Sequence, residues 1–461
     1  MTSASSWRSR LLARTSVAPA VALAGWCIFA GYLLAQALAG PAITWTDSAV
    51  YVHIASRSLW SIGFWAGQRP PATPLLIKLT GSSSGFLAAQ ALVAALSWGF
   101  LAWTVGRLVS PGWRRTAAAW TILAFATAFP VTLWNRSVLS ESLSMSLLAL
   151  VFATLIWTAR RLTWPRVAAT TAVCLCFAAT RDAQIWTVAF LAVAVGVGAI
   201  AAAGQRRGEL AVRAGMLSLC LAGIVALTGS GAVSSHRTEQ NVADVLYVRV
   251  FPFPGRVAWF AAHGMPEQRQ IDELARATAA APGAAKVVGF PVSDPVFAQL
   301  EHWIDAKGTG TYLLWLVTHP GYVVTEPLLR PERSYNFASG DLTFYASSTD
   351  RMASPLTFVM WPPLVALVAL ATVAALVSVV SRAWREGVWR MVFALIVIGI
   401  LSMLVAWHGD GQEVTRHTVE GFAELRLGIW IVIVLWFLGA PPPRPGDAPS
   451  EVTADRQEAV V

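Results

Sequence analysis

The sequence predicts an all-α polytopic membrane protein of about ten transmembrane helices, with interfacial helices in the first outer loop and a long extracytoplasmic segment. Apolar residues make up 56% of its 461 residues and charged residues only 13%, whereas about 25% of the residues in a soluble domain are charged. Mean hydropathy is +0.57, and the apolar residues form long runs. The composition therefore excludes a soluble enzyme, a collagen-like protein and an intrinsically disordered protein.

The long apolar runs predict the individual helices. A helix needs about 20 apolar residues to cross the hydrocarbon core of a bilayer. Several runs are short, 166–180 most clearly, which leaves the number of spans open by about one or two. The predicted spans are 17–39, 86–109, 116–134, 142–158, 166–180, 183–204, 211–231, 355–380, 389–407 and 426–440.

The basic residues predict the orientation of these spans. With the N-terminus inside, seventeen arginines lie in cytoplasmic segments, against seven basic residues in outer segments other than 232–354. The excess on one side follows the positive-inside rule, so we expect a multi-pass plasma-membrane protein with both termini cytoplasmic. The net charge of +9 is explained by these flanking arginines and gives no argument for a nucleic-acid partner. The seven outer residues are Arg57, Arg69, Lys78, Arg136, Arg181, Arg416 and Arg426.

The spans divide the chain into segments. The predicted order is a cytoplasmic N-terminus (1–16), an N-terminal transmembrane module (17–231) with its first outer loop (40–85), an extracytoplasmic segment (232–354), C-terminal transmembrane helices (355–440) and a disordered cytoplasmic tail (441–461). The stretch from Arg8 to Ala39 also resembles a signal peptide with a long apolar part. In either case the residues after Gly40 lie outside. The four cysteines lie inside apolar runs and are interpreted as small core residues.

Ionisable and polar residues gather at the predicted outer ends of the spans. They are Asp47, Tyr51, His53 and Arg69 in the first outer loop, Glu141 in the second outer turn, Arg181 and Asp182 in the third, and Arg416 and His417 in the last. Charges are costly inside a bilayer, so their common side indicates one outward-facing polar site. Structural alternatives stay open: Asp47 and Glu141 as helix caps, Arg181 with Asp182 as a mutually neutralising pair, and Arg416 with His417 as an interfacial anchor.

Amphipathic stretches predict helices that lie on the membrane surface. Residues 48–60 are too short to span and predict an interfacial helix, with Val52, Ala55 and Leu59 on one stripe and Asp47 and Tyr51 on another face. In the outer segment, 266–280 and 294–307 predict amphipathic helices, and 311–329 is apolar enough to lie on the membrane. No metal-ligand spacing, Ser-His-Asp order, P-loop or G-x-G-x-x-G pattern occurs in the sequence.

Several of these motifs together resemble the GT-C superfamily of membrane glycosyltransferases, which use polyprenyl-phosphate sugars and include many actinobacterial members. The resemblance covers roughly 17–230 and 355–440. The motifs are Thr46-Asp47-Ser48 with Tyr51-x-x-x-Ala55, the run from Arg69 to Leu76, Ser140-Glu141-Ser142-Leu143, Thr180-Arg181-Asp182, and Gly409-Asp410, Glu413 and Arg416-His417 before Arg426-Leu427-Gly428. Many members carry two adjacent acidic residues in the first loop, where this chain has Asp47 alone. The long outer segment also departs from the family's compact C-terminal domain.

The resemblance implies transfer of a sugar from a polyprenyl-phosphate donor to a hydroxyl of a glycan, lipid or protein acceptor, with inversion. In that chemistry Asp47 is the expected base, with Glu141 as the second catalytic carboxylate. Arg181, Arg416 and His417 are expected to hold the phosphate, and Tyr51, His53, Arg69 and Asp182 to line the substrate site. No metal ligands are assigned, and a divalent cation stays open.

Two other classes of function remain as alternatives. One is a multispan transporter or lipid flippase, although the sequence shows no inverted repeat of the kind common in transporters. The other is a structural component of an assembly that builds envelope glycans. Transfer of label from a polyprenyl-phosphate sugar by the purified protein would distinguish the enzyme from both.

Overall fold

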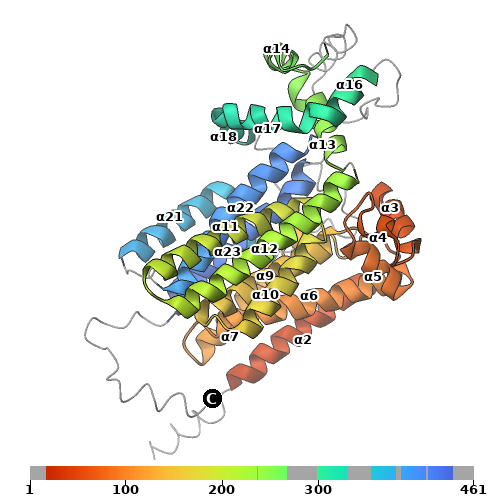
Figure 1. The fold of residues 1–461 in the computed structure, drawn as a ribbon. Coiled ribbons are helices and arrows are strands. Elements are labelled where there is room, and N and C mark those ends of the chain that lie inside the picture. The colour runs from red at the N-terminus through yellow and green to blue at the C-terminus, as the bar shows by residue number, and fades with distance from the viewer. Residues whose placement is uncertain are drawn as a thin grey trace, which may run out of the picture.

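The chain folds into a helical bundle with a smaller helical lobe at one end (Figure 1). The computed structural model describes residues 17–235, 237–266, 298–329, 355–380, 386–411 and 414–439. Within these ranges the only β-type pairings are two isolated bridges, Ile43 with Ser137 and Val109 with Gly439. The predicted all-α class is therefore confirmed for the described residues.

Seven of the described helices are long and apolar enough to cross a membrane. They confirm a multispan helical membrane protein, because each has at least 20 residues and an apolar stretch with few charges. The seven are α2 (Val17–Leu38), α6 (Ser83–Gly106), α9 (Glu141–Arg160), α11 (Asp182–Gly204), α12 (Gly208–Ser234), α22 (Gly387–Gly409) and α23 (Val414–Leu438).

Three further predicted spans form shorter helices. Helix α7 (Trp113–Ala126) has 14 residues and α10 (Trp164–Ala178) has 15. The predicted span 355–380 is divided into α20 (Pro355–Met360) and α21 (Leu364–Val380), the latter with 17 residues. Since about 20 residues are needed to cross the hydrocarbon core, the count of about ten stays a prediction beyond the seven long helices.

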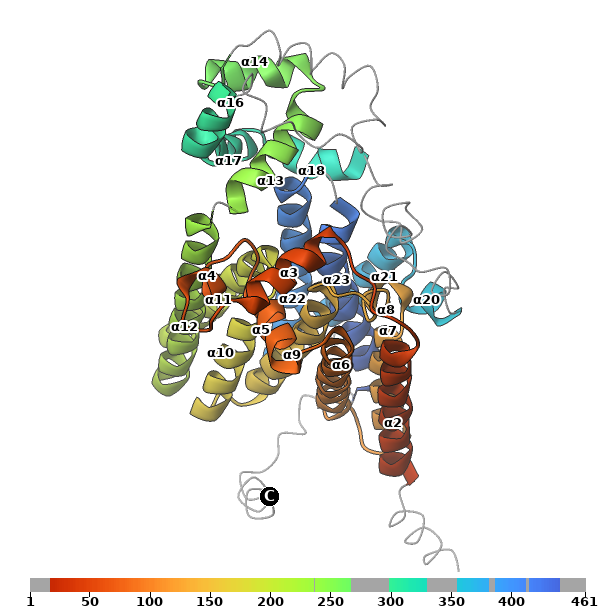
Figure 2. The ribbon, with the colours of Figure 1, turned by 90° about the vertical axis from the view of Figure 1, so that its right-hand side faces the viewer.

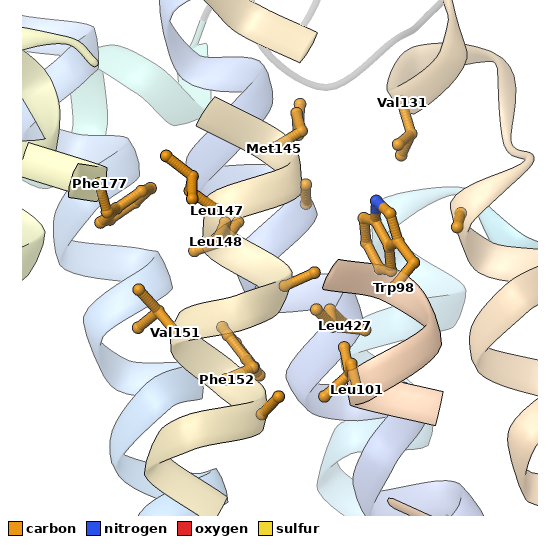
Figure 3. Close-up of a cluster of buried hydrophobic side chains, with 14 of the residues drawn as sticks. Trp98, Leu101, Val131, Met145, Leu147, Leu148, Val151, Phe152, Phe177 and Leu427 are labelled. Carbon is orange, nitrogen blue, oxygen red and sulfur yellow. The ribbon is translucent and has the colours of Figure 1, made fainter. Parts of the chain in front are cut away.

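Helix α9 lies in the middle of the bundle and packs against α6, α10, α22 and α23. Its residues are buried along nearly the whole helix. Figure 3 shows the apolar side chains of this helix between those of its neighbours, with Leu148 and Phe152 among them. Packing of this kind associates helices within a bilayer, where no hydrophobic force drives them together. The first residue of this central, buried helix is Glu141.

Helices α22 and α23 approach each other closely at two glycines. A Cβ on Gly421 would lie 2.7 Å from the backbone nitrogen of Met403, and a Cβ on Gly399 would lie 2.8 Å from that of Leu425. Side chains cannot occupy these positions without moving a backbone. Small residues commonly allow such contacts between transmembrane helices, and here they fix α23 against its neighbour.

Residues 40–85, predicted as the first outer loop, contain three short helices: α3 (Thr46–Ser56), α4 (Ile62–Trp65) and α5 (Ala72–Thr80). The predicted interfacial helix therefore begins and ends earlier than 48–60. Its buried side is formed by Ser48, Tyr51, Ile54 and Ala55, whereas Val52 is exposed, because the helix packs against α5 within the protein. Of the predicted stripe, Ala55 is buried, Val52 is exposed, and Leu59 lies beyond the end of α3.

A lobe is formed by residues 237–266 and 298–329, which have a hydrophobic core of their own around Phe251, Phe260 and Trp303. Figure 2 shows it beyond the end of the bundle at which α3 lies. Two amphipathic helices were predicted in this region. The structure describes the second of them, 294–307, only from residue 298 onward. Of the first, 266–280, all but the first residue lie outside the described residues. The helices are α13 (Arg237–Val245), η1 (Leu246–Val250), α14 (Pro254–Ala262), α16 (Ala298–Trp303), η4 (Ile304–Gly308), α17 (Thr309–Thr318) and α18 (Pro320–Leu329).

Candidate functional site

The last helix begins much earlier than the sequence predicted. The predicted span was 426–440, with Arg416 and His417 in the preceding outer turn, but α23 starts at Val414 and includes both residues. Arg426, predicted on the outer face, lies near the middle of α23 with a side chain that is almost fully buried. Its guanidinium stands 4.4 Å from the ring centroid of Trp361 and 5.3 Å from that of Phe422. The outer placement of Arg426 is therefore wrong.

Arg416 lies between the two carboxylates that the sequence singled out. Its NH2 is 3.0 Å from Asp47 Oδ2, and its Nε donates to Glu141 Oε1. Asp47 comes from the first turn of α3, Glu141 is the first residue of α9, and Arg416 belongs to α23. Three segments distant in the sequence thus contribute one charged cluster.

The cluster continues inward through a second arginine. Arg181, which directly precedes α11, places NH1 3.6 Å from Glu141 Oε1 and 2.9 Å from Glu420 Oε1. The other oxygen of Glu420 accepts a hydrogen bond from Gln184. Glu141 is fully buried and the other two side chains are 8% and 5% exposed. At this depth each charge has an opposite charge beside it, as buried ionised groups require.

At its other end the cluster reaches the surface. Arg69 NH2 is 2.5 Å from Asp47 Oδ1, and the side chains of Arg69 and Asp47 are 37% and 18% exposed. Cations and anions therefore alternate from the accessible end to the buried end, and three arginines balance three carboxylates. We call this series the ion-pair network; its members are Arg69, Asp47, Arg416, Glu141, Arg181 and Glu420.

Tyr51 adjoins the network, and its hydroxyl donates to Ser140 Oγ at 3.2 Å, next to Glu141. Burial raises the pKa of Tyr51 above its usual value of 10, and the negative charge of Glu141 raises it further. Tyr51 is therefore a neutral hydrogen-bonding group at neutral pH. The structure brings this predicted substrate-binding residue to the network.

Asp182 does not pair with its neighbour Arg181. Its Oδ1 is 3.0 Å from NH2 of Arg237, the first residue of α13, and NH1 of the same arginine donates to the backbone oxygen of Gly67 at 2.8 Å. The alternative of a mutually neutralising Arg181–Asp182 pair is therefore wrong. Arg237 instead links the lobe to the beginning of α11 and to the segment between α4 and α5.

The two predicted histidines lie apart from the network. His53 is exposed, and its Nε2 is 3.2 Å from NH2 of Arg57. His417 places Nδ1 3.1 Å from Asp410 Oδ2. In α23 these side chains diverge because successive residues of a helix point in different directions, so Arg416 faces Glu141 while His417 does not. Glu413 lies outside the described residues.

The capping alternative for Asp47 also needs correction. The residue that precedes α3 is Trp45, whose backbone N–H donates to Ser48 Oγ at 2.9 Å. Asp47 lies within the first turn, where a carboxylate interacts favourably with the helix dipole. Both of its oxygens are directed to arginines, so its role is not that of a cap.

Sequence reasoning missed Glu420, Glu424 and Gln184. The spacing contained a usable signal, because Arg416, Glu420 and Glu424 are four residues apart and such residues share one face of a helix. Their charges interrupted the apolar run, and the helix was therefore predicted to start after them. Glu424 is buried, with Oε1 lacking a hydrogen-bond partner among the described residues.

The network does not offer a ligand set for a metal ion. Within the described ranges no three histidine, cysteine or acidic side chains come together closely enough to hold one. Asp47 and Glu141 face each other across Arg416, whose guanidinium occupies the position between the carboxylates. The divalent cation left open by the family resemblance is not supported by this donor set.

The arrangement can do two things chemically. Arginines at its accessible end can bind an anion such as a phosphate, and Asp47 can accept a proton from a group that arrives from the surface. Comparison of the chain with protein-family models, curated proteins and solved structures gives no match.

Proposed function

We propose that the protein is an integral-membrane glycosyltransferase that moves a sugar from a polyprenyl-phosphate donor to a hydroxyl acceptor at the outer face. The observation that supports it most is the position of Asp47. Its carboxylate is partly exposed, with Arg69 on one side and Arg416 on the other. A base and two phosphate-binding cations thus meet where the bundle reaches the surface. The family resemblance of the sequence motifs supports the same chemistry.

The proposed reaction is a single displacement. The acceptor oxygen attacks the anomeric carbon, the bond from that carbon to the phosphate oxygen breaks, and the acceptor proton passes to Asp47. The polyprenyl phosphate leaves with the bonding electron pair and gains negative charge. Arg69 and Arg416 would stabilise that charge more in the transition state than in the ground state, which lowers the barrier. Attack opposite the leaving group inverts the anomeric centre.

The buried part of the network would position Arg416. Glu141 binds its Nε, and Glu141 is in turn held by Arg181, which contacts Glu420. A guanidinium held from behind keeps its remaining donors directed at one place, and pre-organised donors are the more effective in catalysis. A donor phosphate would compete with Asp47 for both arginines. The Asp47 carboxylate would then be released from the arginines and could receive the acceptor hydroxyl.

Asp47→Asn tests the proposal. Asparagine keeps the shape of the side chain but cannot accept the proton, and positioned bases typically contribute about a hundredfold to ten-thousandfold. We expect transfer of labelled sugar from a polyprenyl-phosphate donor to fall by at least about a hundredfold, with thermal stability close to wild type. Asp305→Asn, the same change at an exposed position of the lobe, serves as control. Full activity in Asp47→Asn would refute the assigned base.

A second candidate, a transporter, is favoured by the acidic face of α23. Glu420 and Glu424 are buried one turn apart in a membrane helix, and ionisable residues in such positions commonly mark ion or proton pathways. Proton uptake by proteoliposomes in the presence of candidate solutes tests this function. A flux that is abolished by Glu424→Gln, with no transfer of sugar by the wild type, would establish transport instead.

A further inference from the structure

A pocket at the opposite end of the bundle is lined by arginine and tryptophan. Helix α9 connects the two ends: Glu141 begins it in the ion-pair network, and Arg160 ends it at the pocket. Its 20 residues separate the two sites by about 30 Å at 1.5 Å per residue. The pocket has a volume of about 420 Å³, within the usual range for small-ligand sites. Its charged and aromatic lining consists of Arg107, Arg160, Arg161, Arg166, Trp103 and Trp157.

The positive charge of this pocket is not balanced by any carboxylate of the described residues. No carboxylate lines it, and none of its four arginines forms an ion pair with a carboxylate among the described residues. The nearby pair of Arg213 and Glu209 on α12 is already complete. At the ion-pair network, by contrast, each arginine contacts at least one carboxylate. Four like charges around one cavity repel one another and attract an anion.

Part of the lining, namely Arg166 and the aromatic side chains, is held in place before any ligand arrives. Arg166 NH1 donates to the backbone oxygens of Trp157 and Arg161, at 2.7 and 3.0 Å. Its guanidinium also lies 4.4 Å from the ring centroid of Trp157. Phe100 stacks on Trp103 and meets Trp157 edge-on, which joins the aromatic walls of α6 and α9. Less conformational freedom is lost on binding when side chains are already ordered.

One polar group in the wall has no hydrogen-bond partner in the part of the chain that the structure describes. Thr104 lines the pocket, its side chain is 2% exposed, and its hydroxyl forms no hydrogen bond to the described residues. Buried hydroxyls are nearly always hydrogen-bonded. In helices a threonine usually satisfies its hydroxyl on a carbonyl one turn earlier. The hydroxyl is itself buried, so an oxygen-rich ligand in the pocket would provide the missing bond once the Thr104 side chain turned toward it.

We propose that this pocket binds the phosphate of an anionic phospholipid headgroup. Guanidinium groups bind phosphate oxygens through paired hydrogen bonds, and a Thr104 hydroxyl turned toward the pocket would donate one more. Trp103 is half exposed on the outside of the bundle, where a glycerol and acyl chains would lie. The predicted orientation places this end at the cytoplasmic leaflet, in which basic pockets between helices bind lipid headgroups. The proposal goes beyond the sugar transfer proposed above and does not depend on it.

Native mass spectrometry of the full-length protein in detergent tests the proposal, with phosphatidylglycerol as the probe. We expect wild type to retain the lipid, and Arg160→Gln/Arg161→Gln to bind it at least about tenfold more weakly, because charge-assisted hydrogen bonds are lost. The matched control is Arg206→Gln/Arg207→Gln, two adjacent exposed arginines at the same end of the bundle. The control should bind within about twofold of wild type.

Two further experiments test whether the bound phosphate belongs to a lipid and whether the Thr104 hydroxyl contributes to binding. Valine has nearly the same shape as threonine. Thr104→Val should therefore weaken binding of the lipid by about fivefold, the value of one hydrogen bond. Inorganic phosphate, added as competitor, should displace little lipid. Equal binding by the arginine variants and their controls would overturn the site. Displacement of the lipid by inorganic phosphate at equal concentration would assign the pocket to a soluble phosphate and overturn the lipid headgroup.

Discussion

Replacing Arg181 with methionine removes a central cation of the ion-pair network. Its NH1 is 2.9 Å from Glu420 Oε1 and 3.6 Å from Glu141 Oε1. Water cannot take the place of the lost guanidinium, because Glu141 is fully buried and Glu420 is only 5% exposed. We expect Arg181→Met to destabilise the folded protein strongly through the uncompensated negative charge.

The size of the effect follows from the two contacts. At an effective dielectric constant of about 20, the attraction is about 6 kcal/mol for the shorter contact and about 5 kcal/mol for the longer. The net loss is smaller, because the variant no longer desolvates the guanidinium, and because Arg416 still contacts Glu141 while Gln184 still contacts Glu420. Removal of one partner of a buried ion pair costs about 3–5 kcal/mol, and that is the expected change in unfolding free energy.

A double-mutant cycle isolates the pair. Arg181→Met combined with Glu420→Leu removes both charges and leaves apolar groups of similar size, which is often neutral for stability. We expect a coupling energy of about 2 kcal/mol or more. Unfolding of the purified protein in mixed micelles with increasing sodium dodecyl sulfate, followed by the fluorescence of its tryptophans, measures the four stabilities.

The matched control is the cycle of Arg213→Met and Glu209→Leu. This pair is one turn apart on α12, and Glu209 is 76% exposed. Exposed pairs of this kind contribute about 0.3–0.5 kcal/mol. A coupling energy for Arg181 and Glu420 no larger than that of the control would refute the reasoning, because the burial and the distances would then have no energetic consequence.

Two further predictions concern the bundle and its orientation. Gly421→Ala should lower the free energy of unfolding by about 1–3 kcal/mol in the same measurement, because its Cβ would lie 2.7 Å from the Met403 nitrogen. The control Gly223→Ala has open space around its Cβ and should be neutral or stabilising. Equal effects of the two substitutions would contradict the close approach of α22 and α23. In a cysteine-free background, Trp60→Cys, at a 97% exposed position, should react with an impermeant thiol reagent in intact cells. Gly208→Cys should react only after the membrane is opened. The reverse result would invert the predicted orientation.

The apolar runs predicted most of the bundle because the side chains in contact with lipid must be apolar. The prediction from apolar runs was wrong about where α23 begins. Arg416, Glu420 and Glu424 belong to this helix, but they face the interior of the bundle and are excluded from lipid. A hydropathy pattern does not distinguish a charge in a loop from a paired charge inside a bundle. The same limit explains why Arg426, which lies over the Trp361 ring, was placed on the outer face.

The sequence predicted which residues belong to the candidate site better than it predicted which of them form ion pairs with each other. Clustering at span ends indicated Asp47, Glu141, Arg181 and Arg416, and the structure brings all four together. The pairing itself could not be deduced, because its members come from segments separated by up to 369 residues. The choice between Asp182 and Glu420 as the partner of Arg181 depends on how α11 and α23 pack.

The ion-pair network can serve either the stability of the fold or the positioning of Arg416, and its energetics distinguish the two roles. Replacement of a buried ion pair by apolar residues of similar volume is commonly neutral or stabilising, so a bundle built only for stability would not need six ionisable groups at one end. The Arg181→Met/Glu420→Leu protein separates the two explanations. If the network serves stability alone, this variant loses stability and retains activity for as long as it is folded. If it positions Arg416 for a phosphate, the variant stays folded while sugar transfer falls, because Glu141 and Arg416 lose the cation that holds them from behind.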